Sequence, residues 1–271
     1  MSRQIFFAHA NGFPSGTYGK LFDALAPDFS VTRLSQHGHD PRFPVDNNWH
    51  NLVDELIYHL QQQDEPVLGV GHSLGGILHL HAALRCPQLY KGVVMLDSPV
   101  LTLTDQWVIR AAKRFGFIDR LTPAGRTLGR REEFADRTAA RDYFAVKSLF
   151  RSFDPDCFEA YLEHGLQPVD DRLRLSFDPA TEINIYRGVP HTSPGRILQL
   201  QVPLAMVRGQ DSRVVMRHHA RAVARMPRGE SLSVPGGHMF PLEQPLDTAS
   251  LLKQIFARWE LRHPGPEEHP A

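Results

Sequence analysis

One short segment restricts the folds available to this chain more than any other: the turn GHSLG at residues 71–75. The apolar run at 66–71 predicts a buried strand before it, and the run at 74–86 predicts a helix after it. Glycines on both sides of Ser73 permit a sharp turn, because side chains there would collide with the neighbouring backbone. In this strand–turn–helix context, the G-x-S-x-G pattern lifts a serine hydroxyl out of the sheet and in front of a helix N-terminus.

Short apolar runs alternate with helical patterns over most of the chain. The pattern predicts short strands at residues 4–9, 29–33, 66–71, 92–96, 203–207 and 231–234, of which 4–9, 66–71 and 92–96 are apolar runs. It predicts helices at residues 17–26, 48–63, 74–86, 216–225 and 246–261. Strands that alternate with helices indicate an α/β fold, with a mostly parallel sheet of about six strands and helices on both faces.

The alternation stops between residues 98 and 196, where no buried strand is evident and helical patterns cover residues 106–115, 132–150 and 156–165. We therefore predict a core made of residues 1–97 and 197–262, and a mostly helical insertion at residues 98–196. Four arginines of the insertion could contact an anionic substrate, but we expect them to be solvated: Arg151, Arg174, Arg187 and Arg196. The proline-rich tail at residues 263–271 is predicted to be disordered.

Composition narrows the class of partner. Lys plus Arg and Asp plus Glu are equal, at 30 each among 271 residues, so nucleic acid and anionic membranes are not favoured partners. No run approaches the roughly 18 apolar residues of a spanning helix, and the apolar N-terminal stretch is too short for a signal peptide. We expect a cytoplasmic protein without stable membrane insertion, with Cys86 and Cys157 as free thiols. The oligomeric state is not determined by these features.

Three motifs occur in a family-specific order: the turn at Ser73, Gly-Phe-Pro at residues 12–14 and Gly-Gly-His at residues 236–238. In these motifs the chain resembles the α/β-hydrolase fold superfamily over nearly its whole length, as a serine esterase-like member with a helical lid at residues 98–196. The resemblance implies that Ser73 is a nucleophile. It also implies that His238 is the general base, which would reach the serine from a loop after the last strand.

Two aspartates compete for the role of the acid that orients the base. Asp97 ends the strand at residues 92–96, and Asp211 follows the next strand. The usual acid position in the resembling family lies three residues beyond the glycine that ends this strand, and here that position is Ser212. Asp211 is one residue early, so we favour Asp97, as in family esterases with serine at the usual position, and keep Asp211 as the alternative. Either aspartate could instead cap its loop.

The resemblance also implies an oxyanion hole formed by the backbone N–H groups of Leu74 and Phe13, with His9 or Asn11 bracing the loop. No metal site is predicted, because the histidine pairs lack a second cluster at a suitable spacing and the adjacent His218 and His219 are expected to diverge. The chain contains no nucleotide-binding glycine motif, so no cofactor is expected.

These features predict a serine hydrolase that cleaves a small carboxylic ester or thioester through an acyl-Ser73 intermediate. A carbon–carbon bond hydrolase or a cofactor-free perhydrolase would use the same three residues. A hydrolase-fold protein that binds a small molecule without turnover is the alternative from a different class.

Overall fold

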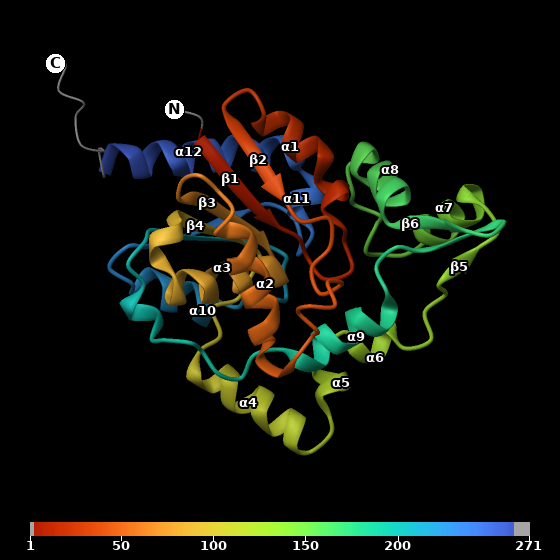
Figure 1. Cartoon of the computed structure of the whole chain (residues 1–271), viewed down its shortest axis with the longest axis horizontal. Coiled ribbons are helices and arrows are strands. Elements are labelled where there is room, and N and C mark those ends of the chain that lie inside the picture. Colours follow the sequence, from red (N-terminus) through yellow and green to blue (C-terminus); the bar gives the residue numbers. More distant parts are fainter. Residues whose placement is uncertain (1–2, 263–271) are drawn as a thin grey trace.

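The computed structural model describes residues 3–262 and contains a parallel sheet of six strands (Figure 1). The strands lie in the order β2-β1-β3-β4-β8-β9, and every adjacent pair is parallel. They are β1 (Arg3–Ala8), β2 (Phe29–Arg33), β3 (Val67–His72), β4 (Tyr90–Leu96), β8 (Leu204–Gly209) and β9 (Gly229–Val234). The predicted fold class is therefore confirmed, whereas the predicted disordered tail lies outside the described residues.

Helices cover both faces of this sheet. On one face lie α1 (Gly19–Leu25) and α12 (Pro245–Arg262), which share an apolar cluster with Phe7 and Val94. On the other lie α2 (His50–Leu60), α3 (Leu74–Arg85) and α10 (Arg217–Ala224), which share a second cluster with Phe6 and Met95. Neighbouring residues of a strand point to opposite faces, so strands buried on both faces are almost continuously apolar.

Residues 98–196, here called the insertion, connect β4 to β8. Their helices are α4 (Leu103–Arg114), α5 (Ile118–Leu121), α6 (Ala124–Thr127), α7 (Arg137–Ala145), α8 (Pro155–His164) and α9 (Pro179–Gly188). In Figure 1, α4, α5, α6 and α9 lie below the sheet, and α7 and α8 lie to its right. The separation of the chain into a core and an insertion stays a prediction.

The insertion also contains strands, which the sequence interpretation missed. β5 (Glu133–Phe134), β6 (Leu166–Val169) and β7 (Arg172–Leu175) form an antiparallel sheet in the order β5-β7-β6. The helix predicted at 132–150 was therefore wrong at its start. The β6–β7 loop is a tight hairpin in which Asp170 has a φ of 53°, a conformation that two-residue hairpin loops require. These strands are short and few of their residues are buried, so they lack the apolar run that marks the central strands.

Shorter elements complete the described chain. They are α11 (Phe240–Glu243) and the 3-10 helices at Ser15–Tyr18, Asn47–Trp49, Pro87–Leu89 and Ile197–Gln199. Cys86 is half-buried and Cys157 is buried, and both are free thiols, as predicted. Between residues 3 and 262, no helix has both the length and the apolar character needed to cross a bilayer.

Candidate active site

Ser73 stands in a strained turn between β3 and α3. Its φ and ψ are 53° and −111°, and it is the N-cap of α3. A Cβ atom on Gly71 would lie 2.2 Å from the carbonyl carbon of Gly75, and one on Gly75 would lie 2.1 Å from the oxygen of Ala8. Only glycine fits at both positions, so the motif follows from backbone contact as well as from conformation.

The end of β4 holds this turn. The Ser73 N–H donates to the carbonyl of Leu96 at 3.0 Å, and the Ser98 hydroxyl donates to the carbonyl of Ser73 at 2.5 Å. The Ser73 hydroxyl itself makes no hydrogen bond to any residue in the described range, including His238. Hydrogen bonds between a nucleophile and its base often tighten only when substrate is bound.

Asp97 contacts His238. Nδ1 of His238 donates to Oδ2 of Asp97 at 2.7 Å, although 141 positions separate the two residues. The Asp97 side chain is fully buried, whereas that of His238 is 27% exposed. Oδ1 of Asp97 also accepts from the Gly209 N–H at 2.9 Å, and Oδ2 accepts from the Ser212 hydroxyl. These donors compensate a buried carboxylate. Nε2 of His238 has no hydrogen-bond partner within residues 3–262.

Asp211 lies apart from this cluster. Its side chain is exposed, and its backbone N–H donates to the carbonyl of Gly236 at 3.0 Å. Ser212, where the resemblance to the hydrolase family led us to expect an aspartate, is buried, and its hydroxyl also accepts from the Val214 N–H at 3.1 Å. Sequence reasoning noted Ser212 only as a missing aspartate, and its role as a donor to Asp97 became evident only in the structure.

His72 links the turn at Ser73 to His238. Its Nε2 donates to the carbonyl of His238 at 2.9 Å, and its Nδ1 therefore accepts from the hydroxyl of Tyr18 at 2.7 Å. The Tyr18 hydroxyl in turn accepts from the Ala10 N–H at 3.3 Å. Burial, reinforced by His238, lowers the pKa of His72 to about 3. A neutral His72 thus connects three loops without supplying charge.

The proposed oxyanion donors differ in their availability. Within the described residues, the Leu74 N–H has no hydrogen-bond partner, as expected at the start of a helix. The Phe13 N–H, by contrast, donates to the carbonyl of Ala10 at 3.0 Å in a turn where Gly12 has a φ of 80°. The role of Phe13 therefore stays a prediction, and its N–H would have to be shared between two acceptors.

The loop that contains Phe13 is braced on both sides. Nδ1 of His9 donates to the carbonyl of Ala10 at 2.8 Å, while its Nε2 accepts from the His37 N–H. The Asn11 amide donates to the carbonyl of Glu182 in α9 at 3.0 Å. Both residues that were expected to brace the loop therefore contact its surroundings.

Ser73 and His238 line one cavity of about 1100 Å³ between the sheet and the insertion. Its buried lining is largely apolar, and Phe13 packs against Phe150 and Tyr161 of the insertion at ring-centroid distances of 6.1 and 5.4 Å. This volume is at the upper end for small-molecule sites. The cavity can therefore take a substrate with a sizeable apolar part.

An ion pair lies in the wall of this cavity. Nη2 of Arg130 donates to Oε2 of Glu182 at 2.5 Å, and the Thr127 hydroxyl donates to Oε1 at 3.3 Å. Glu182 is buried, and the Arg130 side chain is 24% exposed. Burial by itself would lower the pKa of Arg130. The nearby Glu182 carboxylate outweighs this effect, so the pKa of Arg130 is raised. Nothing in the local sequence around either residue indicated this pair.

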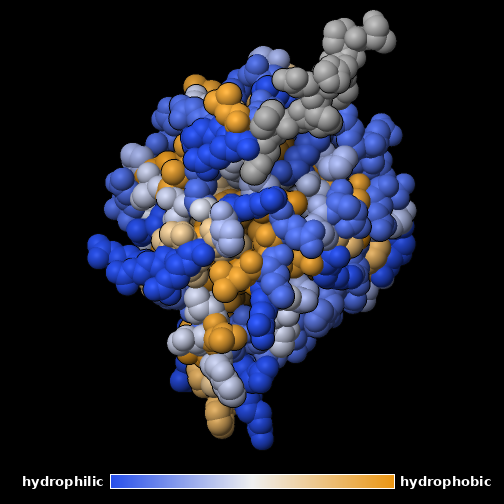
Figure 2. Space-filling model, turned by 90° about the vertical axis from the view of Figure 1, so that its left-hand side faces the viewer, coloured by the Kyte–Doolittle hydropathy of each residue, from blue (hydrophilic) through white to orange (hydrophobic). Residues whose placement is uncertain are grey.

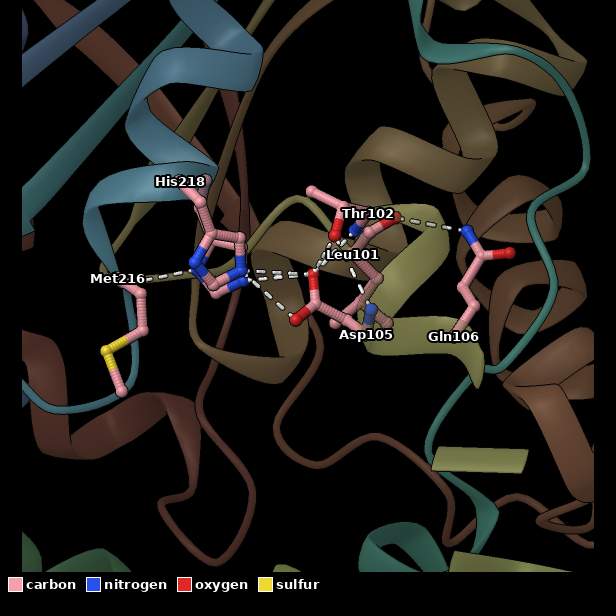
Figure 3. Close-up of polar contacts among 7 residues, drawn as sticks. Leu101, Thr102, Asp105, Gln106, Met216 and His218 are labelled. Atoms are coloured by element: carbon pink, nitrogen blue, oxygen red, sulfur yellow. Dashed lines mark hydrogen bonds and ion pairs between the residues drawn. The ribbon is translucent and has the colours of Figure 1, made fainter. Parts of the chain in front are cut away.

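One cluster within the described residues has metal-ligand chemistry. Asp105 of α4 faces His218 and His219 of α10, and one ligand atom from each lies within 4.8 Å of the others (Figure 3). Nε2 of His218 and of His219 lie 3.1 and 3.2 Å from the Asp105 carboxylate. The expectation that the two histidines diverge was wrong, because an acidic side chain from another element draws both rings together.

The tautomer of His219 opposes metal binding. Its Nδ1 accepts from the Met216 N–H at 2.9 Å, so its Nε2 carries the hydrogen and donates to Asp105. A metal ion on Nε2 would require a hydrogen on Nδ1, directly against the Met216 N–H. The cluster therefore acts as a hydrogen-bonded contact between α4 and α10.

Comparison with known proteins agrees with the fold. A model described as the alpha/beta hydrolase family matches residues 5–251. A pimeloyl-[acyl-carrier protein] methyl ester esterase of Xanthomonas oryzae pv. oryzae is 24% identical over 92% of both chains. A type I acyl-CoA thioesterase, mpaH of Penicillium roqueforti, is 26% identical over 65% of this chain and 44% of its own length. The solved structure of E-2-(acetamidomethylene)succinate hydrolase superimposes with a TM-score of 0.72 at 23% identity, covering 94% of this chain and 91% of that one.

Proposed function

The chain belongs to the alpha/beta hydrolase family, and on that basis we propose that it is a serine hydrolase that cleaves a carboxylic ester or thioester through an acyl-Ser73 intermediate. The observation that carries the proposal is the 2.7 Å contact between His238 and the buried Asp97, beside a cavity that Ser73 also lines. The names of the relatives, an ester hydrolase and a thioesterase, support the same substrate class.

In the proposed reaction, Oγ of Ser73 attacks the acyl carbon while Nε2 of His238 takes its proton. The imidazolium is stabilised by Asp97, and the developing oxyanion is met by the Leu74 N–H together with the loop at Phe13. The leaving alcohol or thiol receives the proton from His238. Water, activated by the same histidine, then releases the acid and regenerates Ser73.

A fluorophosphonate probe tests the nucleophile directly. We expect the wild type to become labelled and to hydrolyse p-nitrophenyl esters, and Ser73→Ala to lose both properties while it remains folded by circular dichroism. A folded wild type that takes up no label would contradict catalysis and favour the non-catalytic binding protein. A labelled enzyme that cleaves neither esters nor thioesters would direct attention to carbon–carbon bond hydrolysis or perhydrolysis, which the same residues can support.

A further inference from the structure

The charged side chains that line the cavity are distributed unevenly with depth. The buried wall contains apolar side chains and Glu182, whose charge is paired with Arg130. Asp105, at the edge, already accepts from Thr102 and both histidines. A carboxylate carried deep into the cavity would therefore meet no unpaired cation among the described lining residues.

The exposed edge of the cavity is different. Four cations line it and form no ion pair with any acidic group in the described range; we call them the cationic rim: Arg120, Arg126, Lys147 and Arg213. They come from α5, from α6, from the segment after α7 and from the loop after β8. Four exposed cations from four segments that line one cavity create a local positive potential, which the neutral overall charge of the chain does not reveal.

The four arginines singled out in the sequence do not belong to this rim. None of Arg151, Arg174, Arg187 and Arg196 lines the cavity. Two of them are held elsewhere on the surface, Arg174 by Glu133 and Arg187 by Asp119. The interpretation of these four as solvated side chains is consistent with their positions.

Exposed apolar residues accompany the rim. They are Val108, Leu121, Leu128, Leu149 and Val214, each between 38% and 51% exposed. In Figure 2, apolar and strongly hydrophilic side chains likewise lie next to each other at the lower end of the molecule, where α4 is located. An opening with both characters suits a ligand whose anionic groups are attached to a partly apolar arm.

We propose, on the basis of the serine hydrolase function above, that the substrate is an acyl group attached to a phosphate-bearing pantetheine carrier. The acyl part enters the apolar cavity toward Ser73, and the phosphates lie on the cationic rim at the opening. Phosphate groups carry several acceptor oxygens and are well matched by arginine and lysine. Coenzyme A and the prosthetic arm of a carrier protein share this chemistry. A single carboxylate would need only one or two of the four cations.

The test compares octanoyl-CoA with S-octanoyl-N-acetylcysteamine, which has the same thioester without phosphate. The measured quantity is the kcat/KM for octanoyl-CoA divided by that for the N-acetylcysteamine thioester. At low ionic strength this ratio should fall at least tenfold in the rim variant, which combines Arg120→Gln, Arg126→Gln, Lys147→Gln and Arg213→Gln. Added salt should lower the wild-type ratio, since exposed charges are screened. The matched control removes four exposed cations away from the cavity: Arg151, Arg196, Arg217 and Arg225, each to Gln. It should keep the wild-type ratio.

Three further results complete the design. An octanoyl group on a carrier protein, assayed beside octanoyl-CoA, identifies which source of the pantetheine phosphate is preferred, and preference for either supports the proposal. An unchanged ratio in the rim variant overturns it. A second result would also overturn it. If an N-acetylcysteamine thioester with a terminal carboxylate on its acyl chain loses as much kcat/KM in the rim variant as octanoyl-CoA does, the rim does not recognise phosphate specifically. A wild type that takes up no fluorophosphonate label would instead contradict the proposed function. Failure of the carrier proposal can therefore be distinguished from failure of the serine hydrolase proposal.

Discussion

At the scale of single residues, the candidate site depends on two backbone conformations that residues other than glycine rarely adopt. Ser73 has a φ of 53°, and Asp97 has a φ of 41°. Such conformations cost about 1–3 kcal/mol each and persist where the surroundings enforce them. Here the enforcing contacts are hydrogen bonds to carbonyls at the ends of β4 and β8. The Ser73 N–H donates to the carbonyl of Leu96, and the Asp97 N–H donates to that of Val207 at 2.7 Å.

Replacing Asp97 tests the assignment of the acid. We expect Asp97→Asn to lower kcat by roughly 10⁴, because an amide at this position favours the wrong tautomer of His238. Asp211→Asn should stay within a few-fold of the wild type, since that side chain is exposed and does not contact His238. Initial rates on a p-nitrophenyl ester measure both.

A second substitution separates loss of the charge from loss of the fold. The Ser212 hydroxyl binds the same Asp97 oxygen that His238 contacts, so a carboxylate at position 212 lies within reach of the imidazole. The double variant Asp97→Asn, Ser212→Asp should be at least ten times as active as Asp97→Asn alone. The double variant Asp97→Asn, Ser212→Ala should be no more active than Asp97→Asn. Near-full activity of Asp97→Asn together with loss in Asp211→Asn would reverse the assignment.

At the scale of elements, the contact between α4 and α10 fixes one side of the cavity. Asp105 forms a capping box with Thr102 at the start of α4 and also accepts from His218 and His219. Burial alone would raise the pKa of Asp105, but hydrogen bonds from Thr102 and His218 outweigh it and lower that pKa. One carboxylate therefore serves both the helix end and the contact with the core.

Removing that carboxylate should loosen α4. We expect Asp105→Ala to destabilise the helix locally by about 1–2 kcal/mol, because a cap and hydrogen bonds to a charged group are lost. Hydrogen exchange followed by mass spectrometry should show faster exchange in Leu103–Arg114. Asp119→Ala, which removes a surface partner of Arg187, is the control and should leave α4 protected. Equal exchange of α4 in both variants would show that Asp105 does not hold it.

At the scale of the whole molecule, several histidines are buried in neutral form. Burial is the largest cause in each case: it lowers the pKa of His9 well below its usual value, those of His72 and His79 to about 3, and that of His81 to about 4. In the unfolded chain these groups titrate near 6.5. Between about pH 6.5 and pH 4 the unfolded state binds more protons, so stability falls as the pH falls.

The difference between the folded and unfolded pKa values of these histidines predicts that the unfolding free energy falls as the pH falls below 7. Each such histidine should add about 1.4 kcal/mol per pH unit to the slope of the unfolding free energy once its unfolded form is protonated. Urea unfolding at pH 7, 6 and 5 measures that slope. His81 is 6% exposed and makes no side-chain hydrogen bond to the described residues. His81→Leu should therefore reduce the slope by the contribution of one histidine, about 1.4 kcal/mol per pH unit. The same slope in both proteins would exclude His81 as a contributor.

The sequence by itself determined the features that depend on neighbouring residues. The turn at Ser73, the six strands of the main sheet and their helices follow from periodicity and from glycines that avoid backbone collisions. These signals lie within about 20 residues and do not require knowledge of the packing. The short strands of the insertion escaped detection because too few of their side chains are buried.

Only the tertiary structure decided which side chains from distant elements meet. Asp97 and Asp211 both follow strands that end at the same edge of the sheet, and the direction of each side chain depends on the local dihedral angles of its loop. The pairing of Arg130 with Glu182, the convergence of His218 and His219 on Asp105, and the cationic rim all join elements that no local pattern connects. Such contacts arise from the relative placement of elements, which packing determines after each element has formed.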